Sequence, residues 1–177
     1  MVDGLEVGET APDAAARLVT PEGDATDVSL STLLADGPVL LCFYTNDFTP
    51  DCIEQWCSFR DFDWFDSEEA VRVVGASRSR VATHRRFIDR FDLTYPLFSD
   101  RDLELSDAFD VTYRVLGALR RSRRSAFLLD ADRTVRYRWL ADHWLDPTRE
   151  VPPVAEIHDA VRREVGVEPE PETFGFS

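Results

Sequence analysis

The chain has 177 residues, 44% of them hydrophobic, which suits one compact domain with a sizeable core and argues against long disordered segments or several domains. Acidic residues outnumber basic ones 34 to 20, and the formal net charge of −14 disfavours general binding to nucleic acids or anionic membranes. The chain contains no lysine, and such an acidic surface is typical of proteins kept soluble in concentrated salt, although a GC-rich codon bias would also remove lysine.

The first half of the chain predicts alternating strands and helices. Two short segments, Ala15–Val19 and Ala25–Ser29, flank a turn and predict a β-hairpin, and residues 30–35 follow as a short helix. Residues 39–44 form a continuous apolar run, which is the pattern of a central strand buried on both faces.

A longer helix is expected next. Thr49 and Pro50 predict its start, with Thr49 as the cap and Pro50 at the first helical position. The weaker apolar run Arg72–Ser77 is a second strand, residues 79–91 have the spacing of an amphipathic helix, and residues 95–98 are a short strand.

The second half predicts an antiparallel pair and a closing helix. Residues 125–130 and 134–140 flank a turn, and residues 154–165 have helical spacing with prolines before them. We expect residues 1–177 to form a single domain, in which about residues 167–177 are a mobile C-terminal tail. The order of elements predicts an α/β fold, with a central mixed sheet flanked by helices on both faces.

The cysteines indicate where chemistry should be sought. Three cysteines, Cys42, Cys52 and Cys57, are an odd number, and residues 1–13 show neither the basic segment nor the apolar run of an export signal. The longest apolar stretch is too short to cross a bilayer. We therefore expect a cytoplasmic protein with free or redox-active thiols. Cys42 lies in the middle of an expected strand, so we expect it to be a core residue.

Cys52 lies at the expected helix start, three residues after Thr49. A helix N-terminus favours the thiolate form of cysteine, and the Thr49 hydroxyl can donate to the sulfur or to a bound oxygen. Arg124, just before the strand 125–130, is the candidate for a permanent positive charge beside the anion. The alternatives are a buried inert Cys52, a plain helix cap at Thr49 and a solvated arginine loop over residues 120–124.

Motifs at coherent spacing across residues 8 to about 165 extend this pattern. They are GETAPD at 8–13, TPDC at 49–52, CSFRD at 57–61, HRRF at 84–87, PLFSD at 96–100 and RSAFLLD at 124–130. Together they resemble the peroxiredoxins of the AhpC/TSA family, and within them the bacterioferritin-comigratory, or peroxiredoxin Q, subgroup.

The resemblance implies a thioredoxin-like fold and a thiol peroxidase that reduces hydrogen peroxide and organic hydroperoxides. It implies that Cys52 is the peroxidatic cysteine, that Thr49 and Arg124 activate it and the peroxide, and that Cys57 is the resolving cysteine. It also implies recycling by a thioredoxin-like protein reductant without a metal or organic cofactor. We expect a monomer or weak homodimer.

The spacing of Cys52 and Cys57 constrains this scheme. On a regular helix, Cα atoms five residues apart are separated by about 8 to 9 Å, whereas a disulfide needs less than about 7 Å. A disulfide between them therefore requires the first helical turn to unwind. A buried, inert Cys57 is the alternative.

Two positions depart from the family's pattern. Thr45 stands where a proline is usual, and Asp51 stands where glycine is common and adds a negative charge beside the nucleophile. These departures keep a non-catalytic redox sensor on a peroxiredoxin scaffold open, and a general thiol-disulfide oxidoreductase is a further alternative. The role of His84 is also left open.

Overall fold

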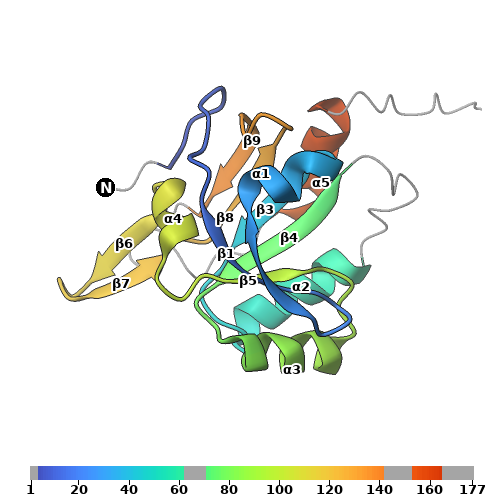
Figure 1. Ribbon diagram of the computed structural model, residues 1–177, viewed down its shortest axis with the longest axis vertical. Coiled ribbons are helices and arrows are strands. Elements are labelled where there is room, and N and C mark those ends of the chain that lie inside the picture. The colour runs from blue at the N-terminus through green and yellow to red at the C-terminus, as the bar shows by residue number, and fades with distance from the viewer. Residues whose placement is uncertain (1–3, 62–70, 142–152, 165–177) are drawn as a thin grey trace, which may run out of the picture.

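A mixed β-sheet is the centre of the structure, a computed structural model that describes residues 4–61, 71–141 and 153–164 (Figure 1). Its strands are β1 (Ala15–Val19), β2 (Ala25–Ser29), β3 (Val39–Phe43), β4 (Arg72–Ser77), β5 (Leu97–Ser99), β8 (Ser125–Leu129) and β9 (Val135–Leu140). They lie in the order β2-β1-β5-β4-β3-β8-β9. β3, β4 and β5 pair in parallel and the other neighbours pair antiparallel, which confirms the predicted mixed sheet.

Helices cover both faces of this sheet. They are α1 (Leu30–Leu33), the short 3-10 helix η1 (Leu34–Asp36), α2 (Pro50–Asp61), α3 (Val81–Phe91), α4 (Glu104–Ala108) and α5 (Val154–Glu164). Apolar residues of α2, α3 and α5 pack with Leu40 and Cys42 of β3, whereas those of α1, η1 and α4 pack with Leu41 and Phe43. Alternate residues of a strand face opposite sides, so this apolar run is buried on both faces, as predicted.

Trp56 of α2 packs closely against Gly75 of the sheet. A Cβ atom at Gly75 of β4 would lie 2.5 Å from Cζ2 of Trp56 and 2.7 Å from Cδ2 of Leu97. Only glycine leaves room for the indole of Trp56, which is fully buried between α2 and β4. This packing fixes the distance of α2 from the sheet.

The sequence did not predict α4 or a separate hairpin of β6 (Thr112–Val115) and β7 (Leu119–Ser122). The hairpin turns through Leu116 and Gly117, whose φ angles are 51° and 74°. Leucine rarely adopts this region, so the turn lacks a recognisable signal. Residues 120–124 do not form the solvated loop that was one interpretation of this arginine run. They begin on β7 and end at Arg124, which is buried.

Within the described residues, no helix is long and apolar enough to cross a membrane, and no cluster of three or more histidine, cysteine or acidic side chains is arranged to hold a metal. The expected C-terminal tail, residues 167–177, lies outside the described residues.

Candidate active site

Cys52 is fully buried in the first turn of α2. The backbone N–H of Ile53 donates to the carbonyl of Thr49 at 2.9 Å, which is the first hydrogen bond of the helix and places Thr49 at the cap position. The Thr49 hydroxyl donates to the carbonyl of Asn46 at 3.4 Å. Thr49 thus starts the helix that carries Cys52, but its hydroxyl makes no hydrogen bond to the sulfur among the described residues.

Arg124 is the charged group that reaches the sulfur. Its Nη2 donates to Sγ of Cys52 at 2.9 Å, and the arginine is only 1% exposed. The contact follows from the sheet register, because Phe43 at the end of β3 pairs with Ser125 at the start of β8. Residues 72 positions apart are thereby brought together at one end of the central strands.

The guanidinium of Arg124 is only partly satisfied. Within the described chain, its Nε and Nη1 are buried and have no hydrogen-bond partner. A buried charge with unpaired donors is costly in free energy, and such groups are concentrated at functional sites. These donors are therefore available to another acceptor near the sulfur.

Thr45 makes a second polar contact with the sulfur. Its Oγ1 lies 3.7 Å from Sγ of Cys52, within reach of a hydrogen bond to sulfur. The residue that departs from the family's usual proline therefore adds a hydroxyl group beside Cys52. The side chain of Asp51, the other departure, is not among the described side chains.

A buried polar network that the sequence did not reveal fixes the loop before α2. The Tyr44 hydroxyl donates to Oδ1 of Asp47 at 2.7 Å, and Nδ1 of His84 lies 2.7 Å from Oδ2. Nε2 of His84 donates to the carbonyl of Phe98 at 3.0 Å, and the N–H of Asp47 donates to the hydroxyl of Ser79 at 2.9 Å. The network ties the loop to β5 and α3.

Burial and the negative charge of Asp47 raise the pKa of Tyr44 well above its ordinary value, so the phenol stays protonated and keeps donating. His84 is fully buried and holds this network, which answers the question left open by the sequence: among the described residues its ring nitrogens are paired with Asp47 and with the carbonyl of Phe98, not with Cys52. The helical spacing of His84 placed it on an apolar face, but nothing in the sequence identified its carboxylate partner.

The other two cysteines occupy different environments. Cys57 is a half-buried free thiol on α2, five residues after Cys52. Cys42 is a free thiol in the interior of β3, and burial raises its pKa far above the ordinary value of 9.0. Cys42 therefore remains protonated and belongs to the core, whereas Cys57 shares a helix with Cys52.

Comparison with known proteins gives consistent results. The profile of the AhpC/TSA family matches residues 7–138. A Mycobacterium tuberculosis protein named as a peroxiredoxin is 38% identical over 125 residues, which are 70% of this chain and 80% of that protein. The chloroplastic peroxiredoxin Q of Suaeda salsa is 33% identical over 113 residues, 64% of this chain and 51% of that protein.

Solved structures agree with the sequence matches. The crystal structure of peroxidoxin BcpB from Mycobacterium tuberculosis is similar with a TM-score of 0.74 and 29% identity, over 90% of this chain and 97% of that one. Peroxiredoxin Q of Xanthomonas campestris is similar with a TM-score of 0.68 and 27% identity, over 93% and 96% of the two chains. The thioredoxin-like fold of these proteins is the fold observed here.

Proposed function

The chain belongs to the AhpC/TSA family, in which it is a peroxiredoxin of the peroxiredoxin Q type and a peroxidase, and we propose that Cys52 is the thiol that attacks the peroxide. The observation that carries the proposal is the Arg124 guanidinium, with one N–H on Sγ of Cys52 and two buried donors unpaired. A cation at this distance stabilises the thiolate, which is the nucleophilic form of cysteine.

The chemistry follows from these contacts. The thiolate of Cys52 attacks the terminal oxygen of hydrogen peroxide or an alkyl hydroperoxide, the O–O bond breaks, and the sulfur becomes a sulfenic acid. The departing oxygen takes up a proton and leaves as water or an alcohol. Nε and Nη1 of Arg124 are suited to bind the peroxide oxygens and to stabilise the negative charge that develops on the leaving oxygen.

Cys57 is proposed as the resolving thiol. Its sulfur condenses with the sulfenic acid of Cys52, water is released and a disulfide forms. Both residues lie on α2, so the first helical turn has to unwind, which removes Cys52 from its buried position against Arg124. A thioredoxin-like protein dithiol then reduces the disulfide by exchange through a mixed disulfide.

The test is steady-state consumption of hydrogen peroxide with a thioredoxin-like dithiol as reductant. We expect activity in the wild type and none in Cys52→Ser. Cys42→Ala is the matched control, because it removes a thiol from the core and leaves Cys52 and its contacts in place. Equal activity in Cys52→Ser and the wild type would overturn the assignment. Reduction of protein disulfides without peroxide turnover would instead support a general thiol-disulfide oxidoreductase.

A further inference from the structure

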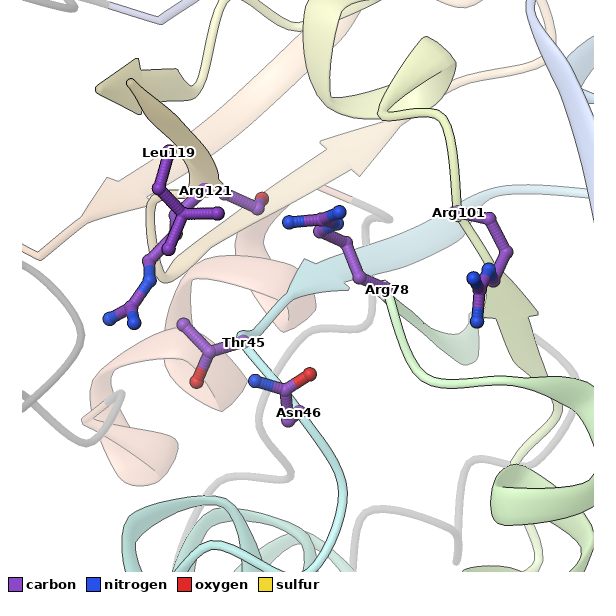
Figure 2. Close-up of a pocket in the computed structure, with 7 residues that line it drawn as sticks. Thr45, Asn46, Arg78, Arg101, Leu119 and Arg121 are labelled. Atoms are coloured by element: carbon purple, nitrogen blue, oxygen red, sulfur yellow. The ribbon is translucent and has the colours of Figure 1, made fainter. Parts of the chain in front are cut away.

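A cavity of about 250 Å³ is lined mainly by polar and cationic side chains (Figure 2). Its cationic lining comes from three separate segments: Arg78 directly after β4, Arg101 after β5, and Arg121 on β7. Figure 2 shows these three side chains around the opening together with Thr45 and Asn46. The unpredicted hairpin of β6 and β7 thus contributes one wall.

The charge of this cavity contrasts with the rest of the molecule. The residues that line it include three arginines and no carboxylate, in a chain with a net charge of −14. Among the described residues, no carboxylate forms an ion pair with any of the three arginines. Arg78 donates from Nη1 to the carbonyl of Arg120 at 3.0 Å, and its buried Nε has no hydrogen-bond partner there. Uncompensated guanidinium groups in a concave site favour an anion.

Thr45 connects the cavity to the sulfur of Cys52. Thr45 lines the cavity, and the hydroxyl of the same residue is 3.7 Å from Sγ of Cys52. One side chain therefore separates the arginine-lined space from the thiol. Leu119, which is 47% exposed, adds an apolar surface for the alkyl part of a ligand. The volume is below the range of about 300–1,000 Å³ that is usual for drug-sized ligands, so it suits a small molecule.

We propose that this cavity is a substrate subsite that binds the carboxylate of an anionic alkyl hydroperoxide while its peroxide group reaches Cys52. The inference rests on the proposed peroxidase role of Cys52 and adds a preference for anionic substrates. The thiolate attacks the terminal oxygen, the O–O bond breaks, and the products are the Cys52 sulfenic acid and, after uptake of a proton, the corresponding hydroxy acid. Arg78, Arg101 and Arg121 hold the carboxylate in this step.

The experiment compares two probes of matched peroxide chemistry: a short tertiary alkyl hydroperoxide with a terminal carboxylate, and its methyl ester. The rate constant for oxidation of Cys52 is measured with each probe at low ionic strength, where charge interactions are least screened. We expect the wild type to prefer the carboxylate by at least about fivefold, the scale of one well-placed ion pair. Arg121→Gln and Arg101→Gln should each lower this ratio, whereas Arg114→Gln, on the exposed hairpin outside the cavity, should leave it unchanged.

The outcomes separate the two proposals. Equal rate constants for the carboxylate and the ester in the wild type would overturn the subsite and leave the peroxidase role intact. A preference for the carboxylate that Arg114→Gln lowers as much as Arg121→Gln would also overturn it, because the effect would then come from overall charge. If neither probe nor hydrogen peroxide oxidises Cys52, the proposed function itself fails, and the subsite fails with it.

Discussion

Replacing Arg124 by methionine separates the catalytic role of the guanidinium from a structural one. The substitution keeps an apolar chain of similar length but removes the guanidinium, whose Nη2 donates to Sγ of Cys52 at 2.9 Å. A hydrogen bond to a charged group contributes about 1.5–3 kcal/mol. Because about 1.4 kcal/mol corresponds to a factor of ten, the rate of reaction with hydrogen peroxide should fall about 10- to 150-fold.

The stability of the same variant should behave differently. Arg124 is buried with two donors unpaired, so its replacement by methionine removes a buried charge whose hydrogen bonds are incomplete. Replacing a buried ion pair by apolar groups is often neutral or stabilising. We expect the free energy of unfolding of the reduced protein to be unchanged or higher.

The assay is the pseudo-first-order oxidation of Cys52 by hydrogen peroxide, followed alongside urea unfolding of the reduced protein. Arg114→Met, which removes a charge from the exposed hairpin, is the matched control. An unchanged rate in Arg124→Met would refute the view that this guanidinium activates the sulfur. A loss of several kcal/mol in stability would show that Arg124 acts mainly as a structural residue.

Three further predictions concern the scaffold and its environment. Gly75→Ala should cost about 1–3 kcal/mol in urea unfolding, because the added Cβ would lie 2.5 Å from the indole of Trp56; an undiminished stability would show that α2 is free to shift. The free energy of unfolding should fall as the pH rises above about 9 to 10, because the unfolded chain releases the protons of Cys42 and Tyr44 while their raised pKa values retain them in the folded state. Alkaline titration of Cys42→Ala should show a smaller fall near pH 9, and a curve identical to the wild type would contradict the reasoning. The thermal midpoint should rise between dilute and molar potassium chloride, because salt screens the self-repulsion of a net charge of −14, and a constant midpoint would exclude salt adaptation.

Local patterns in the sequence predicted much of the fold. The apolar run of β3 and the Thr49-Pro50 start of α2 carry their signals within a few residues, and both elements form where expected. α4 was missed because its N–H groups are capped from outside: the carboxylate of Asp100 accepts from the backbone N–H groups of Leu105 and Ser106, at a spacing unlike a usual cap.

The site was predicted less completely, because its contacts join distant segments. Cys52 and Arg124 were recognisable as candidates from their motifs, but their contact depends on the register of β3 against β8. The pairing of Asp47 with His84 spans 37 positions, and each residue taken alone reads as an ordinary loop or helix residue. The arginines of the cavity come from three segments and have no shared motif.

The most direct test of the central claim is mass mapping of the reduced protein after one equivalent of hydrogen peroxide. We expect a disulfide between Cys52 and Cys57 in the wild type and a Cys52 sulfenic acid in Cys57→Ser. Cys52→Ser should show neither product. Oxidation that appears first on Cys57, or a Cys52 that stays reduced while peroxide is consumed, would contradict the account.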